Sequence, residues 1–144
     1  MSGPHDPLRR SDALRWIGDA QGDLASAVHQ AAAEDLPARV ACFLAHLAVE
    51  KAIKALLVDA GIPFAKVHNL LELHGDLPEP ERALIDPARL AALNPWAVAG
   101  RYTADLVEAD HDVALRLITE ASAVVQVAVE HFDLPAGLPH AGEP

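Results

Sequence analysis

The feature that most constrains the fold is an alanine- and leucine-rich stretch that runs from Pro37 to Leu57 and stops before Gly61. Its interior residues are mostly strong helix formers, proline fits the first turn of a helix, and glycine is common just past the last turn. At helical spacing, one side of this stretch is wholly apolar: Cys42, Ala45, Val49, Ile53 and Leu56. A helix that is apolar over most of its circumference needs neighbours on several sides. The pattern therefore predicts the central helix of an all-α domain.

The other apolar patterns in the chain also repeat at helical spacing, and no stretch alternates as a strand would. The further helical segments expected are one that begins after Ser11 or Asp12, a short one at about 69–73, one at about 80–85, and a last one at about 108–132. Asp86 and Pro87 are expected to break or bend the third of these before its apolar pattern continues to Leu93. Short connections between long helices favour an up-down antiparallel bundle, here of four to five helices.

Chain length and the proline- and glycine-rich ends predict a single domain. The expected organisation is a flexible N-terminus at residues 1–11, a helical domain at 12–132 and a flexible tail at 133–144. The N-terminal residues are polar and do not read as a signal peptide, and no long uncharged apolar run predicts a membrane span. A lone cysteine excludes an internal disulfide and fits a reducing compartment, so we expect a cytoplasmic protein.

The charge balance is acidic: 21 acidic and 11 basic side chains give a formal net charge of −10. A broad nucleic-acid surface would require the opposite sign, so none is expected. The three lysines of the chain, however, all lie within one segment, at Lys51, Lys54 and Lys66. This local concentration keeps open a site for a small anion.

Three motifs occur in a fixed order: Glu50-Lys51-Ala-Ile-Lys54-Ala-Leu-Leu, then Lys66-Val-His68-Asn-Leu, then Gly100-Arg101-Tyr102. Together they resemble the HEPN domain family of small all-helical domains, and the resemblance covers roughly residues 12 to 132. It implies a HEPN-like helical bundle. It also implies assembly, either as a homodimer or with a minimal nucleotidyltransferase subunit, as in toxin–antitoxin pairs.

The motif residues that could bind a nucleotide or another anion are Lys51, Lys54, His68, Arg101 and Tyr102. Each has an alternative structural interpretation. The two lysines could be surface residues whose stems cover apolar neighbours. His68 could tie a connection to the central helix, Tyr102 could pack under its loop, and Arg101 could pair with a nearby carboxylate.

Many HEPN domains cleave RNA with an arginine followed a few residues later by a histidine in the last long helical region. Here nine residues separate Arg101 from His111, and the closer pair of Arg39 and His46 lies on the central helix instead. The sequence therefore predicts a non-catalytic nucleotide-binding or nucleotidyltransferase-partner module, with a metal-independent endoribonuclease as the alternative. No cofactor is expected. Glu108 and His111 match one half of a di-iron carboxylate set without a second half, so no metal is expected either.

Overall fold

The computed structural model describes residues 6–97 and 109–134, and every regular element within them is helical. Three long helices form the body of the domain: α1 (Pro7–Ala32), α2 (Ala38–Ala60) and α6 (His111–His131). The shorter elements are α3 (Leu70–Gly75), α4 (Glu81–Leu84), α5 (Pro87–Leu93) and a 3-10 turn, η1 (Asn94–Trp96). The all-α class predicted from the sequence is confirmed.

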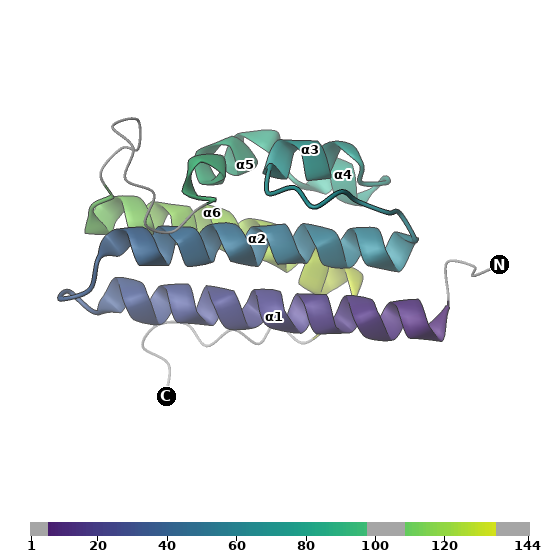
Figure 1. Ribbon diagram of the computed structural model, residues 1–144, viewed down its shortest axis with the longest axis horizontal. Coiled ribbons are helices and arrows are strands. Elements are labelled where there is room, and N and C mark those ends of the chain that lie inside the picture. The colour runs from purple at the N-terminus through teal and green to yellow at the C-terminus, as the bar shows by residue number, and fades with distance from the viewer. Residues whose placement is uncertain (1–5, 98–108, 135–144) are drawn as a thin grey trace.

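The long helices lie side by side, with α2 between α1 and the layer of short helices (Figure 1). In Figure 1 the chain runs along α1 from right to left and returns along α2 from left to right, so these two helices are antiparallel. The short helices α3 to α5 then carry the chain back along the bundle, in the place of one long helix. As a result α6 runs in the same direction as α2, and the C-terminal ends of both lie beside the N-terminal end of α1.

Aspartate side chains cap three of the helices. Asp6, Asp86 and Asp110 accept hydrogen bonds from backbone N–H groups in the first turns of α1, α5 and α6. Such caps satisfy donors that have no partner inside the helix. The expected start of the first helix after Ser11 or Asp12 was wrong, because Asp6 and Pro7 already provide a cap and a pre-set first turn.

The central helix begins and ends where the sequence predicts. Pro37 precedes its first turn, and Gly61 follows its last turn with a left-handed φ of 73°. The other boundaries differ by a few residues: the segment expected at 80–85 is α4, and α6 begins after the Asp110 cap rather than at about residue 108, which lies outside the described residues.

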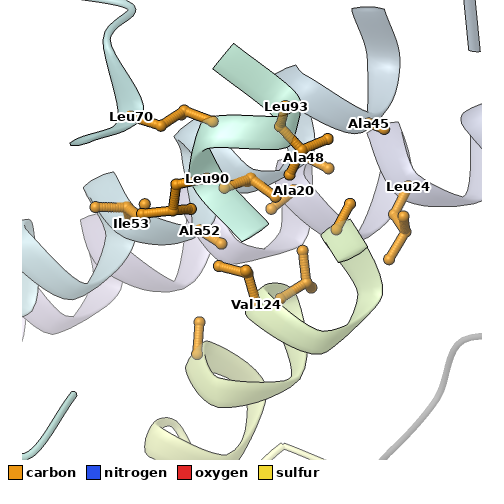
Figure 2. Packing of buried hydrophobic residues seen from close by; sticks show 14 of the residues in the cluster. Ala20, Leu24, Ala45, Ala48, Ala52, Ile53, Leu70, Leu90, Leu93 and Val124 are labelled. Carbon is orange, nitrogen blue, oxygen red and sulfur yellow. The ribbon is translucent and has the colours of Figure 1, made fainter. Parts of the chain in front are cut away.

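The core forms where α2 meets α1, α6 and the short helices (Figure 2). Cys42, Val49, Ile53 and Leu56, predicted to be buried, are all at most 2% exposed. Many of the buried residues of α1 and α2 are alanines, among them Ala20 on α1 and Ala45, Ala48 and Ala52 on α2. Small side chains allow two helices to lie close together, so α1 covers one side of α2 along most of its length.

Two glycines of α1 do not have the role that their spacing suggests. Gly18 and Gly22 are four residues apart, a pattern that favours close approach of another helix. Both are exposed, and a Cβ atom at either position would meet nothing within 4 Å. The small side chains buried on α1 are alanines instead: Ala13, Ala20, Ala27 and Ala31. Within residues 6–97 and 109–134, no helix combines the length and the apolar character needed to span a membrane.

Candidate functional site

A buried carboxylate in the second half of α2 organises the candidate site. Glu50 is only 5% exposed, yet three nitrogen atoms surround its carboxylate. Lys54 Nζ lies 3.0 Å from Oε2, and His68 Nδ1 lies 2.9 Å from Oε1. His46 Nε2 is 3.4 Å from Oε1, and His46 is fully buried. We call these four residues, His46, Glu50, Lys54 and His68, the Glu50 cluster.

The cluster keeps Glu50 ionised. Burial by itself would raise the pKa of this carboxyl group, but the neighbouring side chains of His46, His68 and Lys54, together with the charge of Lys54, lower the pKa to about 2 from its ordinary 4.5. A negative charge this deeply buried persists in proteins only when it is paired and hydrogen-bonded. Glu50 is therefore a fixed anion around which the neighbouring nitrogens are oriented.

Lys54 is an interior member of the cluster. Its side chain is 9% exposed, and its ammonium group lies over the rings of Trp16 and Phe64, at 5.8 and 5.4 Å from their centroids. The two rings themselves meet edge to face. An ammonium group held against aromatic faces and a carboxylate gains from both contacts. Lys54 therefore pairs with Glu50 inside the protein.

His46 joins the cluster to the layer of short helices. It is fully buried, and its Nδ1 lies 3.1 Å from the backbone carbonyl oxygen of Leu93, at the end of α5. A carbonyl oxygen can only accept, so Nδ1 carries the proton of this hydrogen bond. The other ring nitrogen then faces Glu50 at a distance too long for a good hydrogen bond. The ring fixes α5 against α2.

His68 is the member of the cluster that solvent can reach. Its side chain is 65% exposed, although its Nδ1 is held on the buried Glu50. The connection that carries it is itself fixed: the next residue, Asn69, caps α3, and its side chain also accepts a hydrogen bond from Asn94. Because a buried carboxylate fixes one ring nitrogen, the exposed imidazole has a defined orientation.

The remaining predicted site residues do not join the cluster within the part of the chain that is described. Lys51 points toward α1, where its Nζ lies 2.8 Å from Asp23 Oδ2. Arg101 and Tyr102 fall outside the described residues. The structure thus brings together Lys54 and His68, and adds Glu50 and His46. The sequence signal for these two was the placement of His46, Glu50 and Lys54 at successive intervals of four residues, on one stripe of α2.

A second polar cluster lies where α2 and α6 end and α1 begins. His131 lies between Asp59 and Glu81, and Arg10 also reaches Asp59. These four side chains line a pocket of about 600 Å³, together with Pro7, Leu56, Ala60 and Pro78. Neither cluster is a metal site: among the described residues, no group of three or more His, Cys, Asp or Glu side chains could hold a metal ion.

Comparisons with known proteins place the chain in a family. The sequence matches the family model described as "HEPN domain" over residues 13–132. No curated protein matches significantly. Among solved structures, the chain resembles the protein TT1696 from Thermus thermophilus, with a TM-score of 0.68 and 24% sequence identity, over 82% of this chain and 96% of that one. That structural likeness supports the fold alone. On the family match, which spans most of its length, the chain belongs to the HEPN domain family.

Proposed function

We propose that this HEPN domain is a non-catalytic module that binds a small anionic nucleotide at the exposed edge of the Glu50 cluster. The observation that carries the proposal is the position of His68, whose imidazole is 65% exposed while its Nδ1 is held 2.9 Å from a buried, ionised carboxylate. An oriented imidazole on the surface can donate a hydrogen bond to a phosphate from its second ring nitrogen when that nitrogen is protonated. Because the contact with Glu50 already orients the ring, binding of the phosphate would not have to fix the conformation of His68.

The local electrostatics support a small anion more than a polymer. The charge of Lys54 balances that of Glu50, so the exposed imidazole and the nearby exposed Lys66 give the edge of the cluster a neutral to positive character. A charge-assisted hydrogen bond contributes about 1.5–3 kcal/mol, so two or three of them correspond to millimolar to micromolar affinity. The net charge of −10 opposes a long polyanion over a wider surface.

Isothermal titration calorimetry with ATP and with GTP, at about pH 6.5, tests the proposal on the full chain. We expect His68→Ala to weaken binding by about tenfold, the equivalent of one charge-assisted hydrogen bond. His29→Ala is the matched control, because His29 is also exposed but lies on α1. It should leave the affinity unchanged. Nucleotide binding that is untouched by His68→Ala would place the site elsewhere and refute the proposal.

Variants of Arg101 and Tyr102 complete this series, because the sequence groups both with His68. If both residues contribute to the same site, Arg101→Ala should reduce the affinity more than Tyr102→Ala, since only arginine brings a charge to the phosphate. These variants could lose binding while His68→Ala binds fully. That result would mean that the nucleotide site is formed by the segment that contains Arg101 and not by His68.

The alternative function, a metal-independent endoribonuclease, makes an opposite prediction for the same preparation. Incubation with a labelled single-stranded RNA in the presence of EDTA should leave the RNA intact if the module is non-catalytic. Robust cleavage that is lost in His111→Ala would favour the nuclease, with a histidine displaced from the usual spacing. His29→Ala again provides the control for an exposed histidine.

A further inference from the structure

Two aromatic rings lie directly beside the Glu50 cluster and are only partly covered by the protein. Trp16 on α1 and Phe64, in the connection between α2 and α3 (Figure 1), are both half-buried. Their ring centroids are 6.2 Å apart and the ring planes cross at 81°, which is an edge-to-face contact. We call these two residues the aromatic pair. Part of each ring remains accessible to a ligand from solution.

The ammonium group of Lys54 holds the aromatic pair in place from inside. Its Nζ lies 5.4 Å from the centroid of Phe64 and 5.8 Å from that of Trp16. An ammonium group over an aromatic ring occupies one face of that ring. Because Lys54 itself is only 7% exposed, the accessible surface of the two rings lies away from it. The rings are therefore already ordered, and a planar ligand that packs on them has no loose side chain to fix.

A tight turn separates Phe64 from His68. The N–H group of Val67 donates to the carbonyl oxygen of Ala65 at 2.8 Å, which bends the chain at Lys66. Phe64 and His68 lie on the two arms of this bend, and Lys66, between them, is exposed. Four fully extended residues reach about 14 Å, and the bend makes the separation shorter. An aromatic ring, an ammonium group and an imidazole thus lie within reach of one small ligand.

Both arms of the bend are attached to α2 through the same buried ion pair. Phe64 lies against Lys54, and His68 Nδ1 is 2.9 Å from Glu50 Oε1. Lys54 and Glu50 are joined at 3.0 Å, and each is at most 7% exposed. The ring of Phe64 and the imidazole of His68 therefore keep a fixed separation, so a ligand that contacts both does not have to order the connection.

We infer that the aromatic pair is the subsite for the base of the nucleotide, with its phosphate at His68 and Lys66, an inference that rests on the function proposed above. Every nucleobase has a flat π face that stacks on an aromatic side chain. A purine covers more ring surface than a pyrimidine, so a purine nucleotide is the expected class. Stacking depends on the shape of the base and not on its hydrogen-bonding groups, so adenine and guanine nucleotides should bind alike.

A comparison of two ligands on two proteins tests the base subsite on the full chain. AMP and ribose 5-phosphate differ only in the base, and NMR titration measures the affinity of each. We expect AMP to bind the wild type about tenfold more tightly, as one stacked base predicts. In Phe64→Leu, which keeps an apolar side chain without the ring, this ratio should fall close to one. A general effect of the substitution on the fold weakens both ligands and cancels in the ratio.

Phe43→Leu is the matched control, because it makes the same substitution at another half-buried position, on α2. It should keep the tenfold ratio. A second measurement needs no substitution: in the wild type with AMP, the protons of the adenine ring should show intermolecular NOEs to the rings of Phe64 or Trp16. The ring of Phe43 should show none.

The outcomes separate this inference from the proposed function. Equal affinity for AMP and ribose 5-phosphate, or a tenfold ratio that Phe64→Leu leaves unchanged, would overturn the base subsite. If His68→Ala still weakened both ligands in that case, the proposed function would stand without it. No binding of either ligand, or AMP binding that neither His68→Ala nor Phe64→Leu weakens, would refute both.

Discussion

At the scale of single residues, the core of this domain contains charge. His46, Glu50 and Lys54 are each at most 7% exposed. Lys54 and His68 are the partners of Glu50, and His46 is bonded to the backbone carbonyl of Leu93. Removal of one partner from a buried ion pair is costly, because the remaining charge stays in a medium of low dielectric. The Glu50 cluster is therefore a set of mutually dependent residues, and a functional test should change its exposed member, His68, rather than the buried ones.

The depressed pKa of Glu50 predicts a loss of stability in acid. The unfolded chain takes up a proton at about pH 4.5, whereas the folded chain resists it down to about pH 2. Glu50 therefore stabilises the fold fully above about pH 4.5, and this contribution disappears as the pH falls through that interval. A shift of this size corresponds to about 3 kcal/mol. Urea unfolding at a series of pH values from 6 to 2.5 measures it.

The control for this acid dependence is Glu72→Gln, because Glu72 is an exposed glutamate on α3. Glu50→Gln should lower stability near neutral pH and flatten the acid limb of the curve, while Glu72→Gln should leave that limb as it is in the wild type. Equal acid limbs in Glu50→Gln and in the wild type would contradict the assignment of the low pKa to Glu50.

Ile53 provides a prediction about the core itself. Its side chain is fully buried on α2 and faces the short helices (Figure 2). Ile53→Asp would place an unpaired carboxylate there, with a penalty of several kcal/mol against a total stability of about 5–15 kcal/mol. We expect a largely unfolded protein by circular dichroism. Ile62→Asp, at a half-buried position just past α2, is the matched control and should remain folded.

The sequence predicted the pairing of Glu50 with Lys54 because the spacing of four residues on a helix determines that contact. It offered a tie between His68 and the central helix as one of two interpretations, but it could not predict that the partner would be the carboxylate of Glu50, eighteen residues earlier. Nor could it predict that Lys51 would bind Asp23 on α1. Contacts of this kind depend on how two elements pack, and a periodic pattern carries no information about the rotation of one helix against another.

At the scale of elements, the end of α2 is the most constrained boundary. Gly61 has a left-handed φ of 73°, and a Cβ atom there would lie 2.5 Å from the guanidinium of Arg9. Gly61→Ala should therefore destabilise the domain by about 1–2 kcal/mol, from backbone strain and displacement of the arginine.

The same substitution in the middle of α1 should have the opposite effect on stability. Gly18→Ala should stabilise the domain by roughly 0.5–1 kcal/mol, because the position is helical and a Cβ atom meets nothing there.

Thermal unfolding of the two alanine variants side by side checks both signs in one experiment. The comparison is matched because the same side chain replaces the same residue type, once at a left-handed cap and once in a helix interior. A Gly61→Ala variant as stable as Gly18→Ala would show that the left-handed conformation and the contact with Arg9 carry no energetic cost.

Element boundaries followed from the sequence where a residue has a single strong role, as Gly61 has after α2. They were missed where a cap signal preceded the apolar pattern. Asp6 and Pro7 start α1 before its first buried residue, Ala13, so the apolar stripe alone gives too late a start. Asp86 and Pro87 form the same kind of signal in front of α5, where the sequence predicted a break or a bend in the helical pattern.

At the scale of the whole molecule, the chain covers its own central helix. The apolar circumference of α2 predicted either several neighbours or a partner, and within the described residues α1, α6 and the layer of α3 to α5 all contact it. The α2 side chains that these neighbours leave partly exposed include Phe43, Leu44 and Leu47. The large apolar side chains that remain exposed include Leu8 on α1, Leu84 on α4 and Leu115 on α6.

A homodimer, or a complex with a nucleotidyltransferase subunit, remains our prediction for assembly. Multi-angle light scattering of the purified chain should give about twice the 15.3 kDa chain mass if the homodimer forms. Leu115→Glu and Leu84→Glu change exposed positions on different helices, so loss of the dimer in one variant and not in the other would locate the interface. A monomer at micromolar concentration that also recovers no nucleotidyltransferase from cells would contradict the prediction.

The burial of Cys42 has a practical consequence for all of these measurements. It is the only cysteine in the chain, it is fully buried on α2, and burial raises the pKa of its thiol to about 11. A thiol reagent at pH 8 can therefore label the protein only when the helices around α2 separate. The labelling rate then reports how often that separation occurs in the native protein. Cys42 is thus a natural probe for the rate at which the core around α2 opens, and no cysteine has to be introduced for the measurement.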